Sequence, residues 1–319
     1  MTFPHDDPEF DALLRIVAEE RSLSVGLVEK DYWVTHSLWA LHVAGLDVWF
    51  KGGTSLSKGF GLIQRFSEDL DLKIERGRVD ALPAVTDWHR ESKKAIAERQ
   101  AFFQQMAIGV AIPGTELSLE DDPTTKWRQA NVRVNYPGKH LAELDAMLPF
   151  VKLEIGGARV TPFVETALSS FVHDKLVELQ QLGDFDDNRP RAVRCVHPLV
   201  TVVEKLDALQ RRFPRDAVAP ATFVRHFEDV ARVVQAALPP MDGYDSVVAL
   251  ADEMLAQRQI SALPSATDSC FSPSEGPRWD GIRDAYEAIA PMFWGARIPL
   301  DEACEKIREW TGATFASVP

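Results

Sequence analysis

The stretch FKGGTSLSKGFGLIQRFSEDLDLKI (residues 50–74) decides the fold of this protein. Its second half places Asp69 and Asp71 in an apolar run, although aspartate is a poor strand former and buried charge is unfavourable. Alternate residues of a strand point to the same face, so the two carboxylates project together while Leu70 and Leu72 enter the core. Adjacent carboxylates repel unless a cation lies on them. The pair therefore predicts a site for Mg²⁺ or Mn²⁺, which prefer oxygen ligands.

The first half of the stretch predicts a phosphate-binding turn. Gly52, Gly53, Thr54 and Ser55 follow a short strand at 47–50 and open a short helix. Backbone N–H groups at a helix start bind phosphate, and the hydroxyls add further donors. A phosphate cradle beside a carboxylate pair is what metal-assisted transfer of a nucleotide requires. The sequence has neither GxxxxGK[ST] nor a GxGxxG after a strand, which excludes a P-loop or a dinucleotide fold.

Composition limits the class of protein. The chain has 319 residues, of which 45% are hydrophobic and 26% charged, and a net charge of −13. That net charge argues against binding nucleic acid through overall electrostatics. Two local clusters of arginines could still bind it, but they fit an ordinary surface of ion pairs equally well. Three scattered cysteines, no long apolar run and an acidic N-terminus favour a cytoplasmic protein without membrane contact. The clusters are Arg189, Arg191 and Arg194, and Arg211, Arg212 and Arg215.

Hydrophobic periodicity predicts an α+β fold with a mixed sheet, followed by a helical bundle. We expect a nucleotidyltransferase α/β domain with N-terminal helices over 1–190, and a helical domain over 191–319 that contributes to the active-site cleft. The expected strands lie at 47–50, 69–74, 116–137 (a pair), 149–157 and just before Pro198. The expected helices lie at 8–20, 24–44, 80–107, 198–213, 220–238, 243–258, 276–292 and 300–312.

The opening stretch resembles the DNA polymerase β-like nucleotidyltransferases, whose signature is a GG or GS turn followed by a DxD or DxE strand. More narrowly, it is similar to the AbiEii/AbiGii toxin family, which includes the MenT toxins and carries KGGTxLxK and then RxSxDxD. Those motifs read here as residues 51–58 and 65–71, and EKDYWV at 29–34 resembles that family's N-terminal helix. The resemblance extends over roughly 24–235.

The resemblance implies further site residues. VKLEI (151–155) carries Lys152 and, as the third acidic position and metal ligand, Glu154. EKLDALQRR and RHFEDV map to a triphosphate-binding Lys205 and to Asp229, both expected to be catalytic. Lys58 and Arg65 of the two motifs, together with Lys152, are expected to bind the phosphates of the nucleotide. The alternatives are ordinary ion pairs for Glu154 (with Lys152), Lys205 and Asp229, and an aspartate-orienting role for Arg65. Ser67 shares the metal face if the strand is continuous, so its phosphorylation is expected to block the site.

The resemblance also implies a toxin of a toxin–antitoxin or abortive-infection pair, with a cognate antitoxin. For the MenT branch it implies transfer of NMP from an NTP to the tRNA 3′ end, with release of pyrophosphate. Three rivals stay open: transfer to a protein or small molecule, a non-catalytic nucleotide-binding module, and phosphate transfer on the same scaffold. The residues from 239 to 319 carry no motif that assigns them a role.

Overall fold

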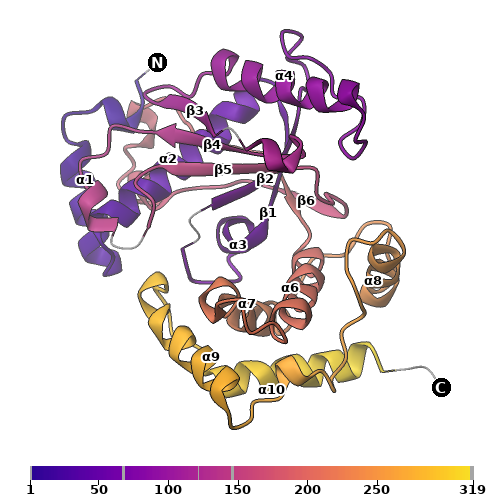
Figure 1. Cartoon of the computed structure of the whole chain (residues 1–319). Coiled ribbons are helices and arrows are strands. Elements are labelled where there is room, and N and C mark those ends of the chain that lie inside the picture. Colours follow the sequence, from indigo (N-terminus) through magenta and orange to yellow (C-terminus); the bar gives the residue numbers. More distant parts are fainter. Residues whose placement is uncertain (1, 67–68, 121, 145–146, 317–319) are drawn as a thin grey trace. The chain divides into compact units, whose positions relative to one another are not determined.

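The structure is a computed structural model that describes residues 2–66, 69–120, 122–144 and 147–316. The chain forms two compact units (Figure 1). The first contains residues 1–59, 67–160 and 165–195, and the second contains 60–66, 161–164 and 196–319. The chain therefore passes into the second unit for seven residues between the glycine turn and the Asp69–Asp71 strand.

A mixed seven-stranded sheet, in the order β3-β4-β5-β2-β1-β7-β6, forms the centre of the first unit. The central strand β2 pairs antiparallel with β1 and parallel with β5, and β1 pairs parallel with β7. Along β2 buried and half-buried residues alternate, as the sequence pattern predicts for a strand with one apolar face. The strands are β1 (Asp47–Lys51), β2 (Asp69–Glu75), β3 (Glu116–Glu120), β4 (Gln129–Asn135), β5 (Val151–Gly156), β6 (Phe163–Thr166) and β7 (Val193–Val196).

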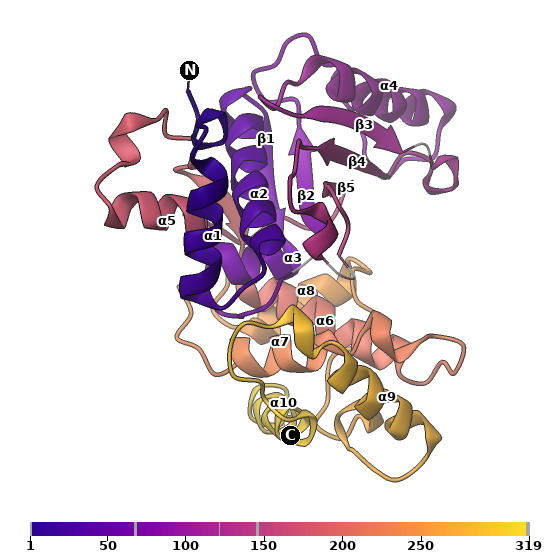
Figure 2. The ribbon, with the colours of Figure 1, turned by 90° about the vertical axis from the view of Figure 1, so that its left-hand side faces the viewer.

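Helix α2 packs against the sheet, with α1 and α5 beside it (Figure 2). Most residues of α2 are buried, and Ser24 caps its first turn by accepting a hydrogen bond from the N–H of Leu27. The helices of this unit are α1 (Phe10–Arg21), α2 (Val25–Val43), α3 (Gly52–Thr54, followed by a π-helical turn at Ser55–Gly59), α4 (Lys93–Gly109) and α5 (Phe171–Glu178).

The structure differs from the sequence analysis at two places in this unit. The helix expected over 80–107 begins only at Lys93, because Ser92 caps it, and the Asp87 carboxylate accepts N–H groups of His89 and Arg90 in a local turn. The segment between β5 and β7, for which the sequence pattern predicts no element, contains β6 and α5, the latter capped by Ser170. Both elements are short, so neither produces a clear periodic pattern.

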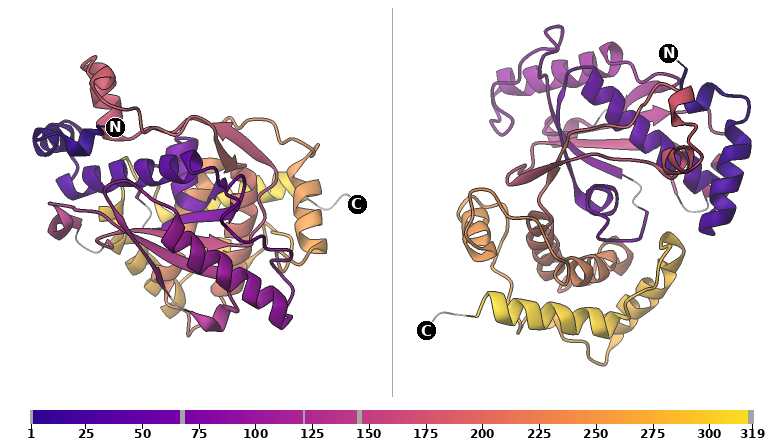
Figure 3. Two further views of the ribbon diagram at one scale, coloured as in Figure 1. Left: turned by 90° about the horizontal axis from the view of Figure 1, so that it is seen from above. Right: turned by 180° about the vertical axis from the view of Figure 1, so that it is seen from behind.

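The second unit is helical, as expected. Helix α7 packs against α6 and α10, and α8 lies beside α6 (Figure 3). The helices are α6 (Pro198–Arg212), α7 (Arg225–Val233), α8 (Val247–Ala256), α9 (Pro277–Ala288) and α10 (Leu300–Thr314). Short 3₁₀ turns elsewhere in the chain lie at Pro4–Asp6, Pro123–Thr125, Leu141–Leu144, Leu182–Asp184, Pro220–Thr222, Ser269–Phe271 and Ala290–Met292.

Residues 60–66, which we call the strap, are held by the second unit. Arg65 forms an isolated β-bridge with Phe293, and the N–H of Phe66 donates to the carbonyl of Met292. The N–H of Trp294 donates back to Gln64, and the rings of Phe66 and Trp294 lie 4.5 Å apart. The strap is thus tied to residues that follow it by more than 220 positions.

Cys195, Cys270 and Cys304 are free and buried, and burial raises the pKa of the Cys195 and Cys304 thiols to about 12. These thiols are therefore poor nucleophiles near neutral pH. Among the described residues, none of the helices combines the length and the apolar character needed to cross a bilayer.

Candidate active site

The two aspartates of β2 share one face of the sheet with residues of β5. Asp69 is paired with Lys152 and Asp71 with Glu154, and directly paired residues of neighbouring strands project to the same side. Both aspartates are half-buried and alternate with the buried Leu70 and Leu72. The strand register therefore brings together four of the residues that the sequence predicted for the site.

Lys152 lies between two of these carboxylates. Its ammonium nitrogen is 3.4 Å from Asp69 Oδ1 and 3.4 Å from Glu154 Oε2. Burial opposes the charged ammonium, but the two carboxylates hold the pKa of Lys152 above its ordinary value. Glu154 therefore makes the ion pair that the sequence left open as its alternative, and its role as a metal ligand stays a prediction.

The carboxylate pair suits a magnesium ion that is shared with a nucleotide. Asp69 Oδ1 is buried and makes no hydrogen bond of acceptable geometry. Its partner is the Lys152 ammonium at 3.4 Å, which compensates its charge but does not meet its hydrogen-bonding capacity. Within the described part of the chain, no three His, Cys, Asp or Glu side chains are grouped as a metal site. Mg²⁺ commonly binds one or two carboxylates and takes its other ligands from water and phosphate. Two aspartates fit that pattern, with triphosphate oxygens completing the ligand set.

Gly52 allows the glycine turn to approach this pair. Its φ is +73°, and a Cβ at this position would lie 1.8 Å from Asp71 Oδ2. Only glycine combines this backbone conformation with that contact. The Asp71 carboxylate therefore lies directly against the start of α3, where no side chain caps the first turn.

The hydroxyl groups of the turn are less available than the sequence suggested. The Thr54 hydroxyl donates to the backbone carbonyl of Asp69 at 2.9 Å, so it positions the start of strand β2. Ser55 is buried, and its hydroxyl has no hydrogen-bond partner of acceptable geometry among the described residues. Gly53 is buried beside them. Phosphate binding by this turn stays a prediction, and the backbone N–H groups are its better candidates. Ser67 lies outside the described residues.

The EKDYWV helix supports the turn from behind. Lys58, expected to contact phosphate, forms a short ion pair with Asp31 at 2.5 Å, and the other Asp31 oxygen accepts the N–H of Phe171. Glu29 accepts the N–H groups of Lys139 and His140. The Lys58 side chain is nearly buried, so its ion pair with Asp31 holds the glycine turn in place and leaves little of the lysine exposed to solvent.

The remaining predicted residues form a second cluster, in the helical unit. Arg65 of the strap donates from Nε and Nη2 to the two oxygens of Asp229, both at 2.7 Å. The Lys205 ammonium lies 2.8 Å from Asp229 Oδ2 and 3.3 Å from His226 Nδ1. Asp229 has no exposed area, and although burial raises its pKa, the two cations hold that pKa well below its usual range. Asp229 is thus an ionised, sequestered carboxylate that positions Arg65 and Lys205.

Lys205 is also buried, and burial lowers its pKa despite the neighbouring Asp229. An ammonium has three N–H donors, of which Asp229 and His226 account for two. Direct contact of Lys205 with the triphosphate therefore stays a prediction. Such a contact would have to use the third N–H of the ammonium.

Sequence reasoning missed a second buried carboxylate, Glu228, next to Asp229. It pairs with Arg232 at 2.7 Å and with Arg297 at 2.5 Å, and it accepts the Tyr286 hydroxyl at 3.2 Å. Arg232 belongs to α7 itself, whereas Tyr286 and Arg297 lie in the region that carries no motif. This region therefore stabilises α7, which carries Asp229. The only signal in the sequence was the second acidic residue in RHFEDV.

The two arginine clusters differ in their partners. In the first, Arg189 and Arg191 pair with Asp187, and Arg194 pairs with Asp47. In the second, Arg211 pairs with Asp207, Arg212 donates to the carbonyl of Thr222, and Arg215 is exposed. The structure therefore favours the ion-paired interpretation for the first cluster and leaves both interpretations open for the second.

With this geometry established, comparison with known proteins places the chain. The model of the family described as "Nucleotidyl transferase AbiEii toxin, Type IV TA system" matches residues 38–306. None of the curated proteins matches the chain. Among solved structures it is similar to the crystal structure of an antigenic nucleotidyltransferase-like protein from Paracoccidioides brasiliensis, with 14% identity and a TM-score of 0.35. That match covers 72% of this chain and 89% of the other.

The chain belongs to the AbiEii family of nucleotidyltransferase toxins. Its enzymatic class is nucleotidyl transfer, and its biological setting is a type IV toxin–antitoxin system, which implies a cognate antitoxin. The family and the α+β fold predicted from residues 50–74 are both confirmed.

Proposed function

We propose that this protein transfers NMP from an NTP to an RNA acceptor, the tRNA 3′ end, in a reaction that requires Mg²⁺ or Mn²⁺. The observation that carries the proposal is the Asp69–Asp71 pair on one face of β2, placed against Gly52 at the start of α3. A carboxylate pair beside an uncapped helix start suits a metal-bound triphosphate.

In this proposal, different residues bind the cation, bind the phosphates and hold the strand in position. Asp69 and Asp71 would hold the cation, which neutralises charge that develops on the triphosphate. The backbone of 52–55 binds phosphate oxygens, while Thr54 fixes the carbonyl of Asp69 and with it the strand. Lys152 moves from Asp69 toward the phosphates when a cation binds. Holding the acceptor hydroxyl in line with the α-phosphate supplies the rest of the rate enhancement.

The choice of acceptor rests on sequence resemblance. KGGTxLxK and RxSxDxD are shared with the branch of the family that modifies tRNA, and both motifs are complete here. The ion-paired arginines of the first cluster are poor candidates for RNA binding, so the proposal assigns that role to other cations. The cognate antitoxin and a cytoplasmic site of action belong to the same proposal.

A labelling experiment tests the proposal. The purified chain is incubated with Mg²⁺, total tRNA and each of the four α-labelled NTPs, beside an Asp69→Asn/Asp71→Asn variant. Glu75→Gln is the matched control, because Glu75 lies on the same face of β2 and pairs with Lys73. We expect label on tRNA with a preferred NTP, loss of at least about a thousandfold in the double variant, and near-normal labelling in the control.

The same experiment separates the rivals. Label on a protein or on a small molecule, with none on RNA, would show that RNA is not the acceptor and would identify the acceptor that takes its place. Release of ADP in place of pyrophosphate would indicate phosphate transfer. Absence of Mg²⁺-dependent NTP binding would overturn catalysis and favour a binding module.

A further inference from the structure

Helix α1 carries one broad apolar stripe. Phe10, Leu13, Leu14 and Val17 lie on neighbouring positions of one side of the helix, because residues three and four apart share a face. Leu14 and Val17 are buried in the core. Ile16 lies at the edge of the stripe and is 46% exposed, so this edge is not fully covered by the protein's own packing.

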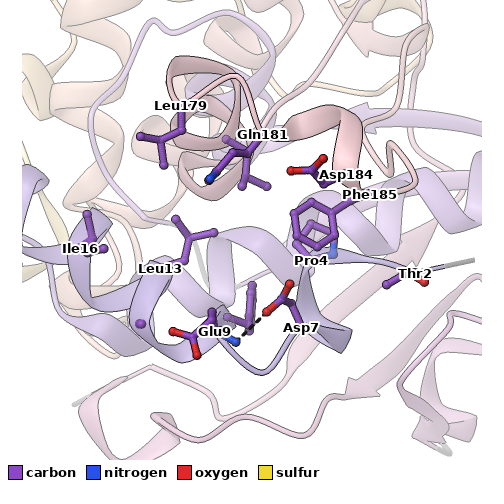
Figure 4. Close-up of a pocket in the computed structure, with 13 residues that line it drawn as sticks. Thr2, Pro4, Asp7, Glu9, Leu13, Ile16, Leu179, Gln181, Asp184 and Phe185 are labelled. Carbon is purple, nitrogen blue, oxygen red and sulfur yellow. Dashed lines mark hydrogen bonds between the residues drawn. The ribbon is translucent and has the colours of Figure 1, made fainter.

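Leu13 and Ile16, at this edge of the stripe, form one wall of a hollow of about 430 Å³ (Figure 4). The opposite wall comes from the end of α5 and the turn that follows it, with Leu176, Leu179 and Phe185. Figure 4 shows Leu13 below Leu179 and Gln181, with Phe185 and Pro4 at one end. All the lining residues belong to the first unit, and none belongs to the predicted catalytic residues.

The edge of the hollow is acidic. Asp7, Glu9 and Asp184 line it, and within the described part of the chain none of the three forms an ion pair. The Asp7 carboxylate accepts the N–H of Glu9, a backbone group that carries no charge. Elsewhere on the surface acidic side chains commonly have cationic neighbours, as Asp11 has Arg15. The two apolar walls and the acidic edge together complement a ligand that has one apolar face and carries positive charges at the margin of that face.

We propose that this groove, defined by Asp7, Leu13, Ile16, Leu179 and Asp184, binds an amphipathic helical segment of a partner protein, with lysine or arginine flanking its apolar face. The volume lies in the range of specific ligand sites, and the two apolar walls suit side chains at i, i+3 and i+4 of a helix. The site is separate from nucleotidyl transfer and adds a protein-docking function to the enzyme.

The test measures fluorescence anisotropy of a labelled 14-residue peptide of leucine and lysine, with leucines at i, i+3, i+4 and i+7, titrated with the full chain. A peptide with the same composition in scrambled order controls for attraction to a chain of net charge −13. Ile16→Glu and Leu179→Glu alter exposed groove positions, so they leave the fold intact. Ile108→Glu is the matched control, because Ile108 is 87% exposed on α4, outside the groove.

We expect the ordered peptide to bind at least about tenfold more tightly than the scrambled one. Each groove variant should lose about tenfold and Ile108→Glu should lose little. Asp7→Asn/Glu9→Gln/Asp184→Asn should weaken binding more than Asp252→Asn/Glu287→Gln/Glu305→Gln, which removes equal charge at exposed positions elsewhere. Equal binding of both peptides, no binding, or equal loss in groove and control variants would overturn the proposal.

Discussion

The Lys152 ammonium lies 3.4 Å from Asp69 Oδ1, in the place where a cation shared by the carboxylates would be expected. Lys152 also contacts Glu154 at the same distance. The chain thus supplies its own positive charge to a group of carboxylates that would otherwise repel each other. A divalent cation that binds Asp69 has to compete with this internal ion pair.

Replacing Lys152 with methionine should therefore tighten the binding of Mn²⁺. The variant removes a competing unit charge and leaves the carboxylates unneutralised, so we expect roughly a tenfold gain in affinity, about 1.4 kcal/mol. Equilibrium titration followed by the Mn²⁺ electron-spin signal measures this without reference to activity. Lys94→Met, on exposed α4, should leave the affinity unchanged. Unchanged or weaker binding in Lys152→Met would show that the lysine does not compete with the metal.

Gly52→Ala should damage the site more than a comparable substitution elsewhere. Its Cβ would meet Asp71 Oδ2, and alanine is strained at a φ of +73°. Gly243→Ala is the control, because Gly243 has a φ of +83° with nothing within 4 Å. Both variants carry a backbone penalty of about 1 kcal/mol, whereas only Gly52→Ala should also weaken Mn²⁺ binding and abolish labelling. Similar metal affinity in the two variants would refute a special role for the contact.

Asp229→Asn should destabilise the helical unit strongly. It leaves Arg65 and Lys205 buried without their counter-charge, which costs about 3–5 kcal/mol of unfolding free energy. Asp280→Asn, which removes the partner of the exposed Arg283, should change it by about 0.5 kcal/mol or less. Urea unfolding of both variants provides the measurement. A loss for Asp229→Asn as small as that of the control would mean that the cluster does not stabilise the fold.

Acidification should weaken the fold through His36 and His173. Burial lowers the pKa of each to about 4, and both rings hydrogen-bond to Asn188. The unfolded chain binds protons near pH 6.5 while the folded chain does not, so unfolding free energy falls from about pH 6.5 to pH 4. The loss is on the order of 3 kcal/mol for each histidine.

Urea unfolding at a series of pH values tests this dependence. His173→Gln should flatten the slope between pH 6.5 and pH 4, whereas His89→Gln, at an exposed position, should leave it as in the wild type. The same slope in all three proteins would exclude His173 as its source.

Several features followed from local sequence because their causes are local. The period of two in DLDLKI places Asp69 and Asp71 on one face whatever the rest of the fold does. The caps at Ser24 and Ser92 fix where helices start, although the second was overlooked and helix α4 was predicted too long. The short elements β6 and α5 gave no periodic signal, so only packing shows them.

The sequence by itself determined the α+β class, the carboxylate pair, the glycine that the turn requires and the family. Tertiary structure alone decided what these residues contact. The register of β5 against β2 brings Lys152 to Asp69 across more than 80 residues, and the strap brings Arg65 to Asp229 across more than 160. The reason is physical: backbone periodicity and capping act within a few residues, whereas ion pairing depends on which distant segments pack together, and no local pattern encodes that.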